Sequence, residues 1–399
     1  MKPIIRFRQY NKEWCPFKLN TILVPSNEKN TKGLYSKNDV LSVSGEAGIV
    51  NQIAFQGRSF AGASVLNYGV VNTNDIVYTK SPLRNNPYGI IKTNNGPSGI
   101  VSTLYAIYNC CEESCPQFVD TYFTSSSRTN NYLRPLVRKG AKNDMKVSSE
   151  GALQGNVIFP YKDEQIEIAS YFRTLDAKLQ ASAKKVDSLK KLKSASLVAM
   201  FPQNGESKPK VRFKGFEGEW STNNLGSIFA ERIESNENGE MLSVTMNNGI
   251  IRSSDNGRFD NSNSDKSKYK VVKIGDIAYN SMRMWQGASG VSQYEGIVSP
   301  AYTVVTPSVD VDTDFFGYLF KTDDVIRLFK LNSQGLTSDN WNLKYPAFSR
   351  ICVSYPESKE EQQAIATFFR SLDRKIALET ARLEKLKQIK LACLDKMFV

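Results

Sequence analysis

Residues 163–201 read DEQIEIASYFRTLDAKLQASAKKVDSLKKLKSASLVAMF, and residues 360–398 read EEQQAIATFFRSLDRKIALETARLEKLKQIKLACLDKMF. The two stretches align without a gap at a constant offset of 197 positions. They share an acidic-Glu-Gln opening, a Phe-Arg pair, a Leu-Asp pair and a closing Met-Phe. A long stretch that occurs twice in one chain indicates two copies of one structural unit.

Both copies are predicted to be single long helices. Neither contains Gly or Pro, and strong helix formers dominate both. At 1.5 Å per residue each helix would be about 55–60 Å long. Apolar residues at spacings of 3, 4 and 7 form one stripe on each helix: Leu175, Leu179, Val186 and Leu189, then Leu372, Ile376, Leu383 and Leu386. The other copy, packed antiparallel, is the simplest cover for each stripe. A coiled coil that only oligomerises the chain is the alternative.

The repeat extends into the sequence that precedes each helix. The matching segments are residues 6–14 with 212–220, residues 75–78 with 276–279, and residues 99–102 with 296–299. The offset between these pairs changes from 206 to 201 and then to 197, always within the segments between the helices. Insertions confined to those segments indicate variable loops on a shared scaffold.

The sequence therefore predicts an α+β protein in which each unit has one globular domain and one long helix. The globular segments contain short β-branched and aromatic runs punctuated by Gly, Asn and Ser, which predicts curved β-sheets with long loops. Antiparallel helices would separate the two domains. The expected boundaries are 1–159 for the first domain, 160–208 for the first helix and linker, 209–356 for the second domain, and 357–399 for the second helix.

The charge is distributed unevenly along the 399 residues, whose formal net charge is +12. Residues 1–159 carry a net of +8 and residues 160–215 a net of +6. Residues 216–356 carry a net of −4, and residues 357–399 a net of +2. The basic first half favours a polyanionic partner such as nucleic acid, whereas the second domain gives that interpretation no support.

Length and cysteine usage predict a cytoplasmic protein of two or three domains. No apolar run approaches the length of a membrane span, and the N-terminus lacks an apolar signal region. The six cysteines include a cluster at Cys110, Cys111 and Cys115. Because the chain has no second cysteine pair at ligand spacing and no histidine, free thiols are favoured over a metal site.

No arrangement of residues predicts catalysis. The absence of histidine excludes Ser-His-Asp triads, and no G-x-G or Walker sequence is present. Asn86-Pro87-Tyr88 lacks the second proline of the Asn/Asp-Pro-Pro-aromatic loop of DNA amino-methyltransferases and is interpreted as a turn. The nuclease-like Asp-x-Lys tripeptide starts at Asp144, but it recurs at Asp176 and Asp373 inside the predicted helices, so it is attributed to chance.

The repeated helix, with its Glu-Gln opening and Met-Phe end, resembles the conserved regions of the specificity subunits of type I restriction–modification systems. FKGFEGEW at residues 213–220 resembles the opening of their target-recognition domains. NSMRMWQG at 280–287 and GIVSPAY at 296–302 are also similar to that family. The first domain departs from the pattern, with Gln9-Tyr10-Asn11 where the second has Gly-Phe-Glu, and Thr103-Leu104 where it has Pro-Ala.

The resemblance implies a non-catalytic reader of double-stranded DNA. Each domain would read one half of a split, asymmetric site, and the paired helices would dock two modification subunits. Those subunits would carry S-adenosylmethionine, and restriction subunits would use ATP and Mg²⁺, so this chain itself would need no cofactor. A protein–protein scaffold and a self-sufficient enzyme are the alternatives. The net charge of −4 on the second domain favours the scaffold slightly.

Candidate DNA-binding residues are chosen because base edges are read by Arg, Lys, Asn or Gln on loops, and phosphates by basic groups. In the first domain the candidates after the 75–78 strand are Lys80, Arg84, Asn85, Asn86 and Lys92, with a basic run at Arg128, Arg134, Arg138, Lys139 and Lys142. In the second domain they are Arg283, Trp285 and Gln286. Lysines 184, 185, 190 and 191 could contact DNA or form a solvated helix face.

The candidates for subunit docking are apolar residues of the two helix stripes: Phe172, Leu175, Leu179, Phe369, Leu372 and Ile376.

Overall fold

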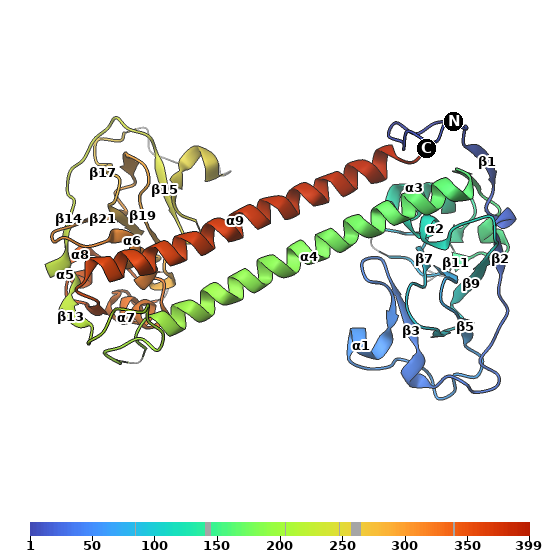
Figure 1. The fold of residues 1–399 in the computed structure, drawn as a ribbon, viewed down its shortest axis with the longest axis horizontal. Helices are drawn as coiled ribbons and strands as arrows, with labels where there is room; N and C mark the ends of the chain where they lie inside the picture. The colour runs from blue at the N-terminus through green and yellow to red at the C-terminus, as the bar shows by residue number, and fades with distance from the viewer. Residues whose placement is uncertain (84, 140–144, 204, 247, 257–264, 338–339) are drawn as a thin grey trace. The chain divides into compact units, whose positions relative to one another are not determined.

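The computed structural model describes residues 1–399 except 84, 140–144, 204, 247, 257–264 and 338–339 (Figure 1). The chain forms two compact units. The first unit contains residues 1–183 and 381–399, and the second contains residues 184–380. The predicted long helices are present as α4 (Lys162–Met200) and α9 (Lys359–Lys396). Each unit therefore combines one globular domain with part of each long helix.

The first domain is built around a four-stranded antiparallel sheet. Its strands lie in the order β2 (Leu23–Pro25), β9 (Tyr105–Cys110), β6 (Ile76–Thr79) and β7 (Ile91–Thr93). Two-stranded pairs surround it: β1 (Cys15–Lys18) with β12 (Asn156–Phe159), β3 (Leu41–Ser44) with β4 (Gly48–Asn51), β5 (Gly69–Val71) with β8 (Gly99–Val101), and β10 (Arg138–Lys139) with β11 (Met145–Lys146). The helices are α1 (Gln52–Gln56), α2 (Pro116–Tyr122) and α3 (Ser126–Leu133), with short turns η1 (Leu19–Thr21), η2 (Lys37–Asp39) and η4 (Gly151–Leu153).

Among the described residues, the second domain repeats this topology except for the β10–β11 pair. Its four-stranded sheet has the order β14 (Phe229–Glu231), β21 (Tyr302–Pro307), β18 (Ile277–Asn280) and β19 (Ser289–Val291). The two-stranded pairs are β13 (Ser221–Asn224) with β22 (Cys352–Tyr355), β15 (Leu242–Thr245) with β16 (Gly249–Arg252), and β17 (Lys270–Val272) with β20 (Gly296–Val298). The helices are α5 (Leu225–Ile228), α6 (Thr313–Leu319), α7 (Asp323–Asn332) and α8 (Tyr345–Phe348), with turns η5 (Ser253–Asn256) and η6 (Met284–Gln286). The sequence repeat is thus a structural repeat, and the mixed helix-and-sheet fold class is confirmed.

The central strands β6 and β18 are buried on both faces. Ile76, Val77 and Tyr78 are fully buried, as are Ile277, Ala278 and Tyr279. A strand that is covered on both faces has a continuous run of apolar residues in its sequence, rather than alternating apolar and polar residues. Both segments show such a continuous run. This central strand leads directly into the loop that carries the predicted DNA-binding residues of each domain.

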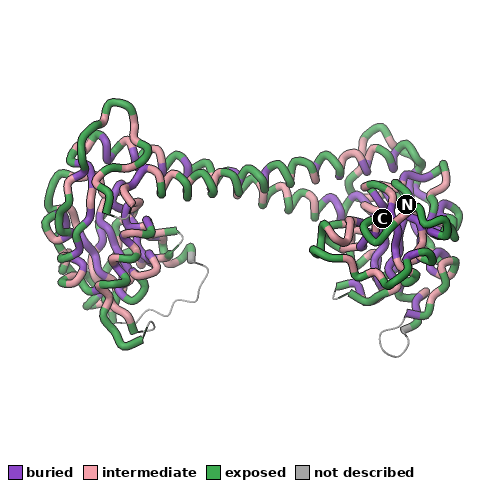
Figure 2. Tube along the Cα trace, turned by 90° about the horizontal axis from the view of Figure 1, so that it is seen from below, coloured by how far each residue is buried: buried purple, intermediate pink, exposed green. Residues whose placement is uncertain are grey.

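The closing Met-Phe of each long helix enters a domain core. Met200 and Phe201 belong to the core of the second domain, together with residues at the start of α9. Met397 and Phe398 belong to the core of the first domain, together with residues at the start of α4. Figure 2 shows the buried residues gathered inside the domains and the mostly exposed stretches of the long helices. The core contacts explain why both copies keep the same last two residues.

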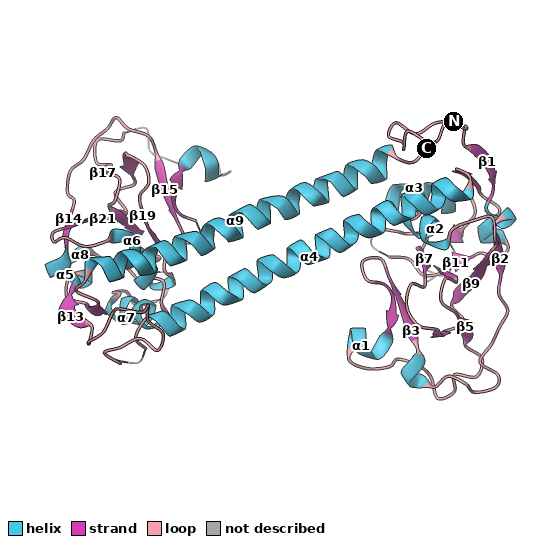
Figure 3. Cartoon of the chain, viewed as in Figure 1, coloured by secondary structure: helices cyan, strands magenta, loops and turns pink. Residues whose placement is uncertain are grey.

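Within each unit the two long helices run antiparallel. In the first unit, the Tyr171 hydroxyl lies 3.4 Å from Cys393 Sγ, and Lys390 forms an ion pair with Asp176. In the second unit, Lys185 pairs with Glu379 at 3.0 Å and Lys193 pairs with Asp373. In both units the residue number on α9 falls as the residue number on α4 rises, so the two helices run in opposite directions. Figure 3 shows both as long helices. Among the described residues, no helix has both the length and the apolar composition needed to cross a membrane.

The Glu-Gln opening joins each long helix to its own domain. Gln165 Oε1 accepts from the Cys115 amide at 2.9 Å, and Gln165 Nε2 donates to the Pro160 carbonyl at 2.9 Å. Gln362 makes the same two kinds of contact, with Asp312 and Pro356, both at 2.8 Å. Both glutamines are almost fully buried, so these hydrogen bonds satisfy polar groups that water cannot reach.

Candidate nucleic-acid interface

The loop after β6 carries the first group of predicted DNA-binding residues. Lys80 is half-buried and Asn85 is exposed. Asn86 is buried, and its Oδ1 accepts from Ser126 Oγ at 3.0 Å. Lys92 is also buried, in β7, where its Nζ lies 3.9 Å from Asp120. Of these four residues, Lys80 and Asn85 are available at the surface. Arg84 lies outside the described residues.

The basic run of the first domain likewise contains one residue with partners inside the domain and others that are exposed. The Arg128 guanidinium donates to the carbonyls of Tyr122 and Leu394, both at 2.7 Å, and it lies 4.5 Å from the ring centre of Phe398. Burial lowers the pKa of Arg128. Because Leu394 is in the last turn of α9, Arg128 caps the C-terminal end of that helix. Arg134 and Arg138 are exposed. Lys139 is in β10 with its side chain outside the described residues, as is the whole of Lys142.

In the second domain the three predicted residues lie together on one turn between β18 and β19. Arg283 is exposed, and its Nη1 donates to Gln286 Oε1 at 3.2 Å. Trp285 is half-buried, and its Nε1 donates to the Met282 carbonyl at 3.1 Å. The turn ends at Gly287, whose φ of 80° is readily adopted only by residues without a Cβ. The structure thus places guanidinium, amide and indole groups on one short element.

Two further residues of this region had not been predicted. Trp341 packs edge-to-face on Trp285, with ring centres 5.2 Å apart and planes at 77°. Lys330 of α7 lies 5.5 Å from the ring centre of Trp341. The sequence repeat could have singled out the two tryptophans of this region. Trp14 matches Trp220, whereas Trp285 and Trp341 have no tryptophan counterpart in the first domain.

A lysine holds this turn in place. Lys321, which follows α6, donates from Nζ to the carbonyls of Gly287 and Ser289, the second at 2.8 Å. It also lies 3.4 Å from the carbonyl of Met246, next to the β15–β16 turn. Burial, together with the positive charge of Lys193, lowers the pKa of Lys321 to about 8. One ammonium group therefore ties two loops of the second domain together.

Part of the chain matches a known protein family. Residues 218–388 match the family model described as the type I restriction modification DNA specificity domain. The matched stretch covers the second domain and the adjoining part of α9. A stretch of 136 residues, which is 33% of this chain, aligns with the HindI specificity subunit of a type I restriction enzyme from Haemophilus influenzae. The sequence identity over that stretch is 26%. The aligned part spans only 29% of that relative's length.

The fold of the whole chain, including the part before the specificity domain, is found in solved structures. A type I restriction-modification system S subunit from M. genitalium aligns over 100% of this chain and 99% of its own, with a TM-score of 0.60 and 15% identity. The HsdS subunit from Thermoanaerobacter tengcongensis aligns over 97% of this chain and 96% of its own at 16% identity, with a TM-score of 0.46 that adds nothing to the fold assignment. The expected resemblance to specificity subunits is thus confirmed.

The predicted docking residues are mostly inside the domains. Phe172 and Leu175 are buried in the first unit, and Phe369 and Leu372 are buried in the second. Leu179 and Ile376 are half-buried. The start of each apolar stripe therefore covers the helix's own domain, and Phe369 and Leu372 are part of the core of the second domain.

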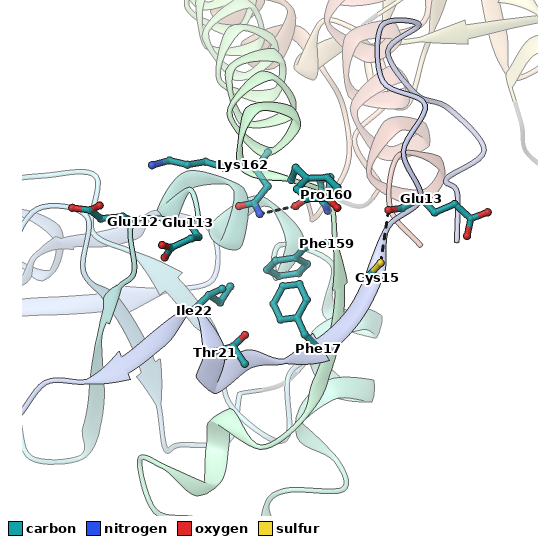
Figure 4. A pocket seen from close by; sticks show the side chains of 12 residues that line it. Glu13, Cys15, Phe17, Thr21, Ile22, Glu112, Glu113, Phe159, Pro160 and Lys162 are labelled. Atoms are coloured by element: carbon teal, nitrogen blue, oxygen red, sulfur yellow. Dashed lines mark hydrogen bonds between the residues drawn. The ribbon is translucent and has the colours of Figure 1, made fainter.

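An apolar pocket of the first domain is at the start of α4. It has a volume of about 700 Å³ and is lined by β1, β12 and the first turn of α4. Phe17 and Phe159 lie edge-to-face in it with ring centres 5.6 Å apart, and Glu112 and Glu113 line it nearby (Figure 4). None of the residues that line this pocket is a candidate DNA-binding residue.

Cysteines and carboxylates form no metal centre in the described part of the chain. All six cysteines are free thiols. Burial raises the pKa of Cys110 to about 11, which keeps this thiol protonated near neutral pH. No group of three or more His, Cys, Asp or Glu residues in the described ranges is arranged to hold a metal ion.

Proposed function

We propose that this chain is the DNA sequence-specificity subunit of a type I restriction–modification complex and is not itself catalytic. The observation that carries the proposal is the match of residues 218–388 to the DNA specificity domain, on a scaffold whose four-stranded sheet and three flanking strand pairs recur in the first domain. Two domains with one scaffold and different loops suit the recognition of two different short sequences. A bipartite, asymmetric site follows, with one domain for each half.

The DNA-reading surface of each domain would be the loop that follows its central strand. In the first domain the candidates at the surface are the half-buried Lys80 and the exposed Asn85, with Arg134 and Arg138 for phosphates. Arg84 and Lys139 remain candidates by sequence. In the second domain Arg283 and Gln286 supply the donors and acceptors that distinguish base pairs in the major groove. Asn86, Lys92 and Arg128 have partners inside the domain in the free chain, so we assign them to the support of these loops.

The long helices would set the gap between the half-sites and dock two modification subunits. Since the first part of each apolar stripe is buried in a domain, docking would use exposed apolar residues elsewhere on the helices. Ile166 on α4, and Leu378 and Leu391 on α9, are such residues. S-adenosylmethionine would belong to the modification subunits, and ATP with Mg²⁺ to the restriction subunits. A cytoplasmic location follows from this role.

The test is the methylome of cells that co-express this chain and its cognate modification subunit, read by single-molecule sequencing. We expect methylated adenine in a motif of two short blocks separated by a gap of constant length. Replacing residues 1–159 with the corresponding domain of a related chain should change one block only. If the complex assembles and no new methylation appears, the DNA-reading function is wrong, and a scaffold that binds only proteins becomes the better hypothesis.

A further inference from the structure

The four tryptophans of the chain fall into two pairs with different surroundings. Trp14 and Trp220 occupy equivalent positions of the repeat and are 1% and 3% exposed, within the two cores. Trp285 and Trp341 are partly exposed and lie against each other. Trp285 and Trp341 have no tryptophan counterpart in the first domain, so the shared scaffold does not account for the second pair.

The Trp285 side chain can offer a ligand only apolar contacts. Its only polar group, Nε1–H, already donates to the Met282 carbonyl at 3.1 Å. The turn that carries it is fixed at its end by Lys321, through the carbonyls of Gly287 and Ser289. A ring that is held in place and has no free donor can add only its faces and edges to a ligand.

The segments of sequence that carry the two tryptophans also carry exposed apolar side chains and positive charge. Met282, Leu331 and Leu336 are 45%, 69% and 100% exposed. Met282 accepts the Trp285 hydrogen bond, and Leu331 follows Lys330, whose Nζ lies over the Trp341 ring. Leu336 and Trp341 both belong to the segment that the Gln334–Asn342 bridge closes. The turn also carries the exposed Arg283.

A ligand that fits such a surface has apolar planar faces and negative charge nearby. DNA has both, in its bases and its phosphates. Aromatic and apolar side chains contact thymine methyl groups in the major groove or pack against bases that are partly unstacked. Lysine and arginine beside them would meet the phosphates.

We propose that Trp285 and Trp341 form an aromatic surface that contacts bases in the half-site read by the second domain. This inference rests on the proposed function. Because the only tryptophan of the first domain is the core residue Trp14, the two domains would read their half-sites by different chemistry. The first would rely on hydrogen-bonding and basic side chains, and the second would add apolar contact.

The first experiment uses the wild-type complex with its modification subunit and requires no variant. Acrylamide quenching of tryptophan fluorescence reports mainly on Trp285 and Trp341, because Trp14 and Trp220 are buried. We compare quenching in the free chain, in the complex, and in the complex with a cognate duplex. The proposal predicts that the duplex protects the indoles. Quenching that the duplex leaves unchanged would overturn it, as would protection that the modification subunit alone provides, which would indicate a protein-docking surface.

The second experiment compares the motifs written by wild type, Trp341→Ala and the aromatic control Trp341→Phe. Each mismatched base pair typically reduces affinity by about 5- to 150-fold, so loss of the contact should relax one or two positions by a factor in that range. We expect relaxation only in the second domain's half-site for Trp341→Ala, and little change for Trp341→Phe. If wild type writes a split motif and Trp341→Ala writes the same one, this inference is wrong and the specificity function stands. If wild type writes none, the proposed function itself fails.

Discussion

Arg212 holds Glu361 through two contacts of 2.6 Å, one from Nε and one from Nη2. Arg6 makes the same pair of contacts with Glu164, both at 2.7 Å. Both glutamates are nearly inaccessible to water. Two parts of the repeat that are far apart in sequence, the Arg-Phe segment before each domain and the Glu-Gln opening of each helix, therefore meet in space. Each ion pair joins the start of a domain to the start of the helix that leaves it.

Replacing Arg212 by methionine should loosen the start of α9. Methionine leaves Glu361 as a buried carboxylate without its charged partner, and removing one member of a buried ion pair typically costs about 3–5 kcal/mol. Hydrogen exchange of peptides covering residues 359–372 measures the loss. The double variant Arg212→Met/Glu361→Gln should recover part of it, because no buried charge remains. Peptides from residues 162–175 of the first unit serve as the internal control, and equal protection in wild type and variant would contradict the prediction.

Phe201→Ala should destabilise the second unit, although Phe201 ends a helix that begins in the first domain. The Phe201 ring lies 5.5 Å from that of Phe315 and 5.9 Å from that of Phe369, measured between ring centres. Truncating a buried phenylalanine leaves a cavity and typically costs about 3–5 kcal/mol. Leu192→Ala, at a half-exposed position of the same helix, should cost less than about 0.5 kcal/mol and is the matched control.

The measurement for Phe201→Ala is again hydrogen exchange, read separately in the two units. Faster exchange should appear in the sheet β14-β21-β18-β19 and not in the sheet β2-β9-β6-β7. Equal loosening of both sheets would show that the units do not unfold separately. No loosening of either would show that the ring does not stabilise the core.

The sequence was sufficient to predict the repeat and the two long helices, because these depend on period and composition. It was not sufficient to rank the DNA-binding candidates. Lys92 and Arg128 have the residue type and the position that phosphate binding requires, but Asp120 and the Leu394 carbonyl hold them inside the domain. Those partners are 28 and 266 positions away, and no local pattern indicates them. Likewise, Phe172 and Phe369 lie on an apolar stripe, yet only the tertiary structure shows that a domain covers it.

Substitutions of Arg128 and of Arg134 should therefore have different effects on the salt dependence of DNA affinity. Arg128→Met removes two charge-assisted hydrogen bonds to carbonyls, each worth about 1.5–3 kcal/mol, and should lower the stability of the first unit. It should leave unchanged the slope of log affinity for DNA against log salt concentration. Arg134→Ala, at an exposed position, should leave stability unchanged and reduce that slope by about 1, because one phosphate contact is lost. A reduced slope for Arg128→Met would show that Arg128 reaches DNA after all.

Lys321 should make the stability of the second unit depend on pH in the alkaline range. Its pKa is about 8 in the folded chain, mainly through burial, compared with 10.5 for an ordinary lysine. Between these two values the unfolded chain binds more protons than the folded chain, so the free energy of unfolding contributed by this group rises with pH. The maximum slope for a single group is about 1.4 kcal/mol per pH unit. Below pH 8 the ammonium is charged in both states, and the cost of burying it is fully present.

Lys321→Met is the comparison that isolates this contribution. Other groups titrate between pH 8 and 10.5, but they do so equally in both proteins and cancel in the difference. Urea unfolding followed by tryptophan fluorescence reports chiefly on the second unit, which holds three of the four tryptophans. We expect the wild-type free energy of unfolding to increase relative to the variant between pH 8 and 10. Lys193→Gln should weaken that increase, because removing the neighbouring positive charge raises the pKa of Lys321 toward its ordinary value. Parallel curves for wild type and Lys321→Met would show that the ammonium has an ordinary pKa and is not enclosed by the loop carbonyls.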